Sequence, residues 1–272
     1  MKNVVLWSVL CILSFVQCTG KKAGNVEDTI GYEFDVQEEL SFKEVPFPDL
    51  LGSTMQLLKV DSLLLINDFH GDSLIHIYNL NTQRKMGYLV AKGNGPHELL
   101  APLELQQDGE NLWVLSRPMH VLSHVPLSAI GRNVSASLVR DGSVKGEADC
   151  FVPLPPNHLG YSGFFTKRYG LADTEHLEEV KEFGDYPDFW EDEKNFPVEA
   201  KAMFHQSRFA VNVTEHLFAS CSYFALEIYG YGTSSADVPE LKFRKQLGRY
   251  EYDYQQGMQV SASLRPGADL AA

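Results

Sequence analysis

Residues 55–102 read MQLLKVDSLLLINDFHGDSLIHIYNLNTQRKMGYLVAKGNGPHELLAP and contain four short apolar runs, at 55–60, 63–66, 74–78 and 86–91. The segments between these runs are rich in Asn, Asp and Gly, which favour tight turns. The run at 63–66 is continuously apolar, as in a strand that is buried on both faces. The pattern predicts an antiparallel meander of four short strands.

A glycine loop, Gly93-Asn94-Gly95-Pro96-His97-Glu98, follows the meander. We expect Gly93 and Gly95 to supply positive φ angles and Pro96 to fix the exit of the loop. A Gly-x-Gly sequence can also cradle a phosphate, but that site needs a helix behind the loop and a lysine directed back at it. Neither pattern follows here. We therefore interpret Gly93, Gly95, Pro96 and Glu98 as a structural handover loop that leads into the next sheet.

The same succession of apolar runs and turns recurs along the chain at a period of about 45–50 residues, which is typical of four-stranded propeller blades. A second blade is predicted from runs at 103–107, 112–115, 121–125 and 136–140, with a helical turn within 126–131. A third is predicted from 151–154, 159–165, 166–171 and 178–183, and a fourth from 202–205, 209–213, 217–221, 225–231 and 241–246. A glycine, a proline and an acid recur in that order at 184–189, and Gly248 begins another handover.

The N-terminus has the pattern of an export signal. A short basic start precedes an apolar run at 4–16, which is too short for a comfortable membrane span. Cys18 follows this run after Gln17, an arrangement that resembles a bacterial lipoprotein box, where the cysteine is lipidated and becomes the new N-terminus. Gln17 stands where that motif usually has a small residue. The alternative is cleavage by ordinary signal peptidase near Gly20.

The repeat, the handover loop and the N-terminus together resemble the TolB-like six-bladed propeller lipoproteins of Bacteroidetes. The handover loop of that family is similar, a Gly-x-Gly-Pro-x-Glu followed by a proline, and Pro102 fills the last place here. The resemblance covers about residues 40–254. It implies a propeller in the cell envelope, lipid-anchored to the outer membrane on its periplasmic or surface face, and it brings no settled catalytic residues.

The predicted fold is therefore all-β, a β-propeller of the six-bladed type that is incomplete, with about four blades present. Six blades of this period would need roughly a hundred residues more. A closed four-bladed ring is the alternative, with residues 40–45 as the strand that closes it. The predicted parts are a leader at 1–18, a tether at 19–39, the blades at 40–254 and an irregular tail at 255–272, which has no strand pattern from Ser261 onwards.

Several residue patterns contain groups that could form a chemical site. His120 and His124 share one face of a strand, but zinc needs three or four converging ligands, so we predict no metal site. We interpret the acidic string Asp185, Asp188, Glu191, Asp192 and Glu193 as a solvated loop, because aromatic residues interrupt any calcium-loop spacing. Cys150 and Cys221 lie on apolar runs in separate blades, which favours buried free thiols over a disulfide, although an oxidising envelope permits one.

The net charge and the residues of the predicted inner strands favour some function classes over others. The net charge of −13 argues against nucleic-acid binding, which requires a basic face. The predicted inner strands are mostly apolar, with Lys59 and Glu104 as charged exceptions, whereas an enzyme needs converging His, Arg and carboxylates. We predict no catalytic residues and no cofactor, and favour a binding or scaffold module for a protein or glycan partner. The alternative is a propeller-type hydrolase or lyase that acts on an extracellular polysaccharide or peptide.

Overall fold

The computed structural model describes Ser41, Glu44 and residues 51–130, 138–146, 148–189, 191–234 and 237–247. The chain divides into two units, 1–38 and 39–272, and all the described residues belong to the second. The predicted leader, the closing strand at 40–45, the handover at Gly248 and the tail lie outside the described residues, apart from Ser41 and Glu44.

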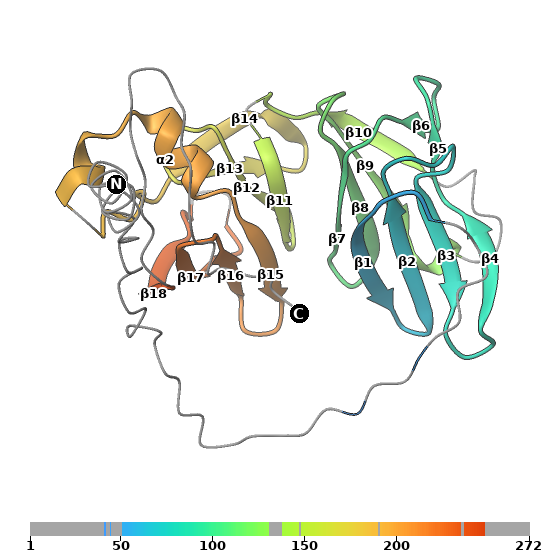
Figure 1. The fold of residues 1–272 in the computed structure, drawn as a ribbon. Coiled ribbons are helices and arrows are strands. Elements are labelled where there is room, and N and C mark those ends of the chain that lie inside the picture. Colours follow the sequence, from blue (N-terminus) through green and yellow to red (C-terminus); the bar gives the residue numbers. More distant parts are fainter. Residues whose placement is uncertain are drawn as a thin grey trace, which may run out of the picture. The chain divides into compact units, whose positions relative to one another are not determined.

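Four antiparallel four-stranded sheets make up the described unit, each in the strand order of a meander (Figure 1). The first blade consists of β1 (Thr54–Val60), β2 (Leu63–Asp68), β3 (Ile75–Asn79) and β4 (Arg84–Tyr88). The second consists of β7 (Leu103–Gln107), β8 (Asn111–Ser116), β9 (Val121–Pro126) and β10 (Val139–Ser143). The third consists of β11 (Ala148–Leu154), β12 (His158–Gly163), β13 (Tyr169–Asp173) and β14 (His176–Phe183). The fourth consists of β15 (Arg208–Asn212), β16 (Leu217–Cys221), β17 (Ala225–Gly230) and β18 (Glu240–Gln246).

Shorter elements occupy the connections. The handover loop pairs β5 (Ala91–Lys92) with β6 (Glu98–Leu99) in a small parallel sheet. A 3₁₀ turn, η1 (Leu127–Ala129), follows β9, where the sequence predicts one helical turn. The long connection between β14 and β15 contains the 3₁₀ helix η3 (Glu191–Asn195) and the α-helix α2 (Val198–Phe204). Among the described residues, no helix is both long and apolar enough to cross a membrane.

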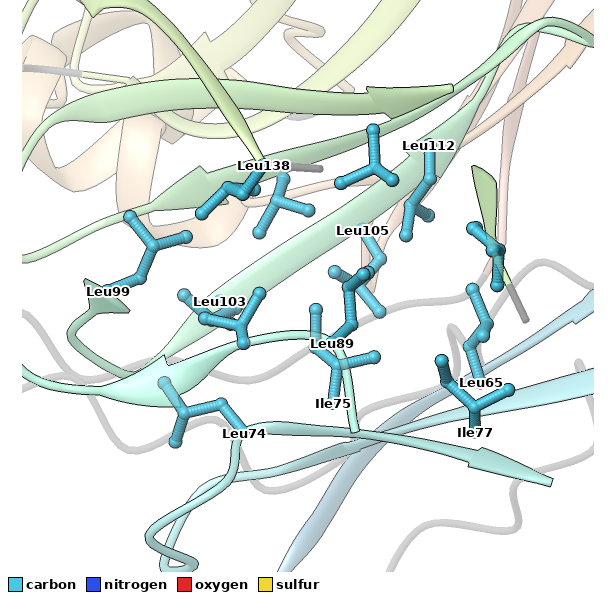
Figure 2. Close-up of a cluster of buried hydrophobic side chains, with 14 of the residues drawn as sticks. Leu65, Leu74, Ile75, Ile77, Leu89, Leu99, Leu103, Leu105, Leu112 and Leu138 are labelled. Atoms are coloured by element: carbon cyan, nitrogen blue, oxygen red, sulfur yellow. The ribbon is translucent and has the colours of Figure 1, made fainter. Parts of the chain in front are cut away.

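Apolar side chains fill the spaces between consecutive blades. The first cluster joins blades 1 and 2 and includes Leu65, Ile77, Leu105 and Val114, all of them fully buried (Figure 2). The second, around Leu115, Phe151 and Tyr161, joins blades 2 and 3, and the third, around Cys150, Phe209 and Phe218, joins blades 3 and 4. The inner strands follow the same order, since β1 contacts β7, β7 contacts β11 and β11 contacts β15. Consecutive sheets therefore bury apolar side chains against one another, as blades of a propeller do.

The prediction of about four blades is confirmed for the described residues, but one predicted strand and one predicted loop conformation are wrong. Residues 202–205 were expected to be a strand of blade 4, whereas Ala202 and Phe204 belong to α2 and the inner strand is β15. Gly93 and Gly95 were expected to adopt positive φ, and neither does. A Cβ on Gly93 would collide with the Glu98 carboxylate, so a larger side chain there requires this carboxylate to move, and the requirement for glycine comes from close approach and not from backbone conformation.

Candidate functional site

The innermost strands of blades 2, 3 and 4 bring three polar side chains together. Glu104 of β7 accepts a hydrogen bond from the Cys150 thiol of β11, with 3.2 Å between Oε1 and Sγ. The other carboxylate oxygen of Glu104 accepts one from Arg208 Nη1 of β15, also at 3.2 Å. Arg208 Nη1 lies 3.7 Å from Cys150 Sγ. We call Glu104, Cys150 and Arg208 the axial cluster.

Burial sets the chemistry of the axial cluster. The side chain of Glu104 is 7% exposed, whereas that of Arg208 is 45% exposed. The Arg208 guanidinium therefore reaches solvent while it is bound to a buried carboxylate. Burial raises the pKa of the Cys150 thiol well above its ordinary value, and the charge of Glu104 adds to the rise while Arg208 partly offsets it. The thiol therefore remains protonated near neutral pH and acts as a donor, whereas a nucleophilic cysteine requires a thiolate.

Blade 1 contributes an amide contact near the start of the next inner strand. Gln56 of β1 donates from Nε2 to the Leu105 carbonyl at 2.7 Å and accepts from the Leu105 N–H at 2.9 Å. Asn67 of β2 donates to the Leu103 carbonyl at 2.9 Å. These side chains bond to the outer edge of β7, which has no strand partner on that side among the described residues. We interpret these contacts as structural links between blade 1 and blade 2.

A second polar group, the blade 3–4 network, centres on the buried carboxylate of Glu227 in β17. Glu227 accepts hydrogen bonds from Arg168 Nε at 3.0 Å, from the Tyr169 hydroxyl at 2.7 Å and from Arg244 Nε at 2.9 Å. Arg168 also donates to the Ser207 hydroxyl and lies 4.4 Å above the Tyr169 ring. Both Arg168 and Glu227 are essentially inaccessible to solvent. The network therefore ties blade 3 to blade 4.

Burial and the charges of this network set the protonation states of Glu227 and of the nearby His205. Burial alone would raise the pKa of Glu227, but Arg168, the Tyr169 hydroxyl and Arg244 lower it below its ordinary value. Burial, together with Arg168, Arg244 and Lys201, lowers the pKa of His205 well below its ordinary range, so this imidazole is neutral at neutral pH.

His205 and Ser222 do not form an activated pair. His205 Nδ1 lies 3.3 Å from Ser222 Oγ, and both residues are buried. Ser222 Oγ accepts the Ala225 N–H at 3.1 Å, which is the bonding of a side chain that closes a turn. Neither side chain is presented to solvent, so the pair gives no nucleophile for an external substrate.

The structure places the predicted handover residues in one compact loop. The Glu98 carboxylate turns back and accepts the Gly95 N–H at 2.9 Å, and the Glu98 N–H donates to the Gly95 carbonyl at 3.2 Å. Pro96 stands between them and is exposed. The predicted lipidation site, Cys18, lies outside the described residues.

The side chains weighed as metal ligands are dispersed. His124 binds Asp141, with Nδ1 2.8 Å from Oδ1, and packs on the Trp113 ring. Within the described ranges, three potential ligand atoms gather only at Asp173, Glu175 and His176, in the largely exposed turn between β13 and β14. Asp173 there accepts the Glu175 N–H at 2.8 Å, a common way to close such a turn.

The acidic string is partly paired. Asp185 binds Lys167 and Asp188 binds Lys201, each at 2.7 Å. Glu193 is buried and accepts the Phe189 N–H at 2.8 Å, so it ties η3 to the segment just before it. The expectation of a solvated loop is wrong for Glu193, because its carboxylate is buried and accepts a backbone N–H.

Sequence reasoning noticed Glu104 and Cys150 separately but missed Arg208, Arg168 and Glu227. Arg208 and Glu104 are 104 positions apart, and Arg168 and Glu227 are 59 apart. The only available signal was a charged residue inside or beside an apolar run, which Glu227 and Arg208 both provide. A buried charge requires a partner, but one sequence does not say which.

Comparison with protein families settles the architecture. Residues 47–265 match the model of the family described as TolB-like 6-blade propeller-like. The chain belongs to this family. The resemblance drawn from the handover loop and the repeat is thus confirmed for the family and the fold. A search of curated proteins finds no match.

Several solved structures are similar to this member of the TolB-like family. A putative exported protein from Bacteroides fragilis is 15% identical, with a TM-score of 0.50, over 74% of this chain and 54% of that one. A member of the DUF4221 family from Bacteroides vulgatus is 11% identical, with a TM-score of 0.45, over 78% and 61%. The WD40 domain of coronin from Toxoplasma gondii is 12% identical, with a TM-score of 0.45, over 72% and 46%. The chain thus matches about half the length of these proteins.

Proposed function

We propose that this protein is a cell-envelope lipoprotein, anchored through Cys18, whose propeller binds a protein or a glycan. The leader pattern and the cysteine that ends it support the envelope location. The propeller supports a binding role, because consecutive blades form a rigid platform that presents connecting loops at its two ends.

The observation that carries the binding role is the saturation of the polar groups on the inner strands. In the axial cluster, Glu104 bonds through both carboxylate oxygens and Cys150 is a buried, protonated thiol. A hydrolase or lyase needs an acid, a base or a nucleophile that can reach the substrate. The exposed group of the axial cluster is the Arg208 guanidinium, which is bound to Glu104. It can recognise a ligand but does not by itself act as an acid or a base.

The binding end proposed is the one that carries the β12–β13 and β16–β17 connections. Cys150, near the start of β11, contacts Arg208 at the start of β15, so these two connections lie at the same end of the blades. Each carries an exposed aromatic side chain, Phe164 at 45% and Tyr223 at 38%. Exposed aromatic residues are enriched at binding surfaces, where they provide large contact areas.

The test is a binding screen of the full-length protein against envelope glycans and candidate peptides, with turnover measured on the same panel. We expect saturable binding without turnover. Phe164→Ala and Tyr223→Ala should each weaken affinity by about tenfold or more, as truncated anchors do. Val213→Ala is the matched control, because Val213 is similarly exposed in the connection at the opposite end of blade 4. Turnover that Glu104→Gln abolishes would replace this proposal with the hydrolase or lyase.

The anchor is tested separately. We expect Cys18 to carry the lipid and to be the first residue of the mature chain when the protein is expressed in a bacterium with lipoprotein processing. Mass spectrometry of the N-terminal peptide measures this directly, and Cys18→Ser should release the protein from the membrane fraction. An unmodified chain that starts after Gly20 would exclude the anchor.

A further inference from the structure

Two arginine side chains from different blades reach the starts of the inner strands. Arg117 directly follows β8 of blade 2 and forms an ion pair with Asp149 of β11. Arg208 is the first residue of β15, and its Nη1 pairs with Glu104 and lies 3.7 Å from Cys150 Sγ of β11. Asp149 and Cys150 are consecutive residues, whose Cα atoms are about 3.8 Å apart. The two guanidinium groups therefore contact neighbouring positions of one inner strand, and we call Arg117 and Arg208 the arginine pair.

Both ion pairs are oriented in the same way with respect to solvent. The side chains of Asp149 and Glu104 are 14% and 7% exposed, whereas those of Arg117 and Arg208 are 36% and 45% exposed. An anion that approaches from solvent therefore meets the guanidinium groups before the carboxylates that neutralise them. A guanidinium carries several N–H donors in a planar fork, so an arginine that is held by one carboxylate can bind a second anion.

This orientation gives the starts of the inner strands a charge opposite to that of the whole chain, which is −13. The charged residues of the described inner strands are Lys59 of β1, Glu104 of β7, Asp149 of β11 and Arg208 of β15. Lys59 lies near the other end of its strand, and the two acids are paired with the arginine pair. The exposed charge that the inner strands offer at this end is therefore positive, which favours an anionic ligand.

The arginine pair lies at the same end of the blades as the exposed aromatic side chains of the binding end proposed above. Arg117 follows the last residue of β8, which pairs with the first residue of β7. Arg208 pairs with Cys221, two residues before Tyr223 in the β16–β17 connection. Phe164 lies in the β12–β13 connection at this end. Flat aromatic rings can pack on the apolar faces of sugars, and a guanidinium binds a carboxylate through two parallel N–H donors.

We propose that the arginine pair recognises the carboxylates of an acidic polysaccharide, whose sugar rings pack on Phe164 and Tyr223. This inference rests on the binding function proposed above and names the class of its ligand. The site is built from side chains on separate connections, whereas an extended peptide usually adds to a strand edge. The outer edge of β7 bonds to the side chains of Gln56 and Asn67, so it is not open to such a peptide. An acidic glycan is therefore favoured over an acidic peptide.

The first test measures the affinity of the full-length protein for polygalacturonate, alginate and hyaluronate, and for the same polymers after reduction of their carboxyl groups. We expect at least one native polymer to bind, and reduction to weaken its binding about tenfold or more, because charge-assisted hydrogen bonds are lost. Arg117→Gln and Arg208→Gln should each have an effect of similar size. Arg84→Gln is the control, because Arg84 is exposed at the start of β4, at the opposite end of blade 1. Absence of binding to all three native polymers would overturn the proposal.

The second test uses the parent chain and does not depend on how the variants fold. Phenylglyoxal modifies accessible arginine side chains, and peptide mapping gives the rate at each position. A saturating amount of the bound polymer should slow modification of Arg117 and Arg208 about fivefold or more and leave the rate at Arg84 unchanged. Equal rates at the arginine pair with and without the polymer would exclude it as the binding site.

The outcomes separate this inference from the binding function on which it rests. Binding of an acidic peptide but of no acidic polysaccharide overturns the inference and leaves the binding function intact. The same conclusion follows if Phe164→Ala and Tyr223→Ala weaken polymer binding while Arg117→Gln and Arg208→Gln do not. A protein that binds neither glycans nor peptides contradicts both.

Discussion

At the scale of single residues, the buried polar groups join blades. Glu227 accepts bonds from Arg168 and Tyr169 of the preceding blade, and Glu104 accepts bonds from two later inner strands. Such contacts are directional, and removing one partner leaves a buried charge without compensation. These residues therefore define which blade packs against which, beyond the attraction that apolar burial supplies.

Glu227→Gln should destabilise the protein by about 3–5 kcal/mol, the usual cost of breaking a buried ion pair, because two guanidinium groups lose their shared anion. Thermal or urea unfolding measures this cost. Glu240→Gln is the control: its carboxylate pairs with Lys242 at the surface, and its loss should leave the unfolding midpoint unchanged. Equal midpoints for the parent and Glu227→Gln would contradict the role of the network.

Glu227 also predicts a pH dependence. Because its folded-state pKa is lowered, it stabilises the fold at pH values above its unfolded pKa of about 4.3, and this contribution disappears as the pH falls through the folded value. The unfolding midpoint of the parent should therefore fall more steeply below about pH 4.3 than that of Glu227→Gln. Parallel curves for the two proteins would show that Glu227 titrates equally in both states.

In the handover loop, Gly93→Ala should displace the Glu98 carboxylate and cost about 1 kcal/mol, the value of the lost bond to the Gly95 N–H. The same substitution in a Glu98→Ala background should cost much less, because the obstructing carboxylate is gone. Urea unfolding of the four proteins gives this double-mutant cycle. An equal cost in both backgrounds would mean that Gly93 is required for another reason.

At the scale of elements, the connection between β14 and β15 is the main addition to the repeating pattern. Phe204 of α2 is buried and packs on Phe196 and Phe224, with ring centroids about 6 Å apart. Lys201 of the same helix binds Asp188. A helix of seven residues is too short to be stable alone, so these contacts hold it in place.

Phe204→Ala should therefore cost about 3–5 kcal/mol, as large-to-small substitutions of buried aromatic residues do. Met203→Ala, at a neighbouring exposed position of the same helix, is the control and should change stability little. Unfolding by urea, followed by tryptophan fluorescence, measures both. A small effect of Phe204→Ala would show that α2 packs loosely on the β16–β17 connection.

The sequence predicts most strands because their apolar runs are short, bounded by Asn, Asp or Gly and spaced like blades. It fails at α2 for a physical reason. The buried residues of this helix, Ala200, Ala202 and Phe204, lie two positions apart, which imitates the alternation of a strand. Pro197, just before the helix, was the available signal for its start.

The candidate site is less predictable, because its residues meet only in the folded chain. Glu104 stands out as a charge on an inner strand, but its partners come from two other blades. Gly93 was recognised as necessary for the loop, yet the reason is the returning carboxylate of Glu98, which no local pattern reveals. Most strands can be inferred from the spacing of apolar runs, whereas the pairing of polar side chains between blades cannot.

At the scale of the whole molecule, the described part is a succession of four blades with apolar clusters between consecutive sheets and polar contacts near the inner strands. We propose that these polar contacts hold the propeller together and that the protein binds its partner without catalysing a reaction. Cys150 offers the most direct test of this proposal, because its thiol lies beside a carboxylate and a guanidinium and is the side chain of the axial cluster nearest to a reactive group.

The most direct test is the alkylation rate of Cys150 by iodoacetamide in the folded protein at pH 8, with peptide mapping to separate it from the other cysteines. A buried, protonated thiol should react at least about a hundredfold more slowly than the same cysteine in denaturant, because reaction requires local opening. Alkylation of folded Cys150 as fast as in the unfolded chain would contradict the account and identify an accessible nucleophile on the inner strands.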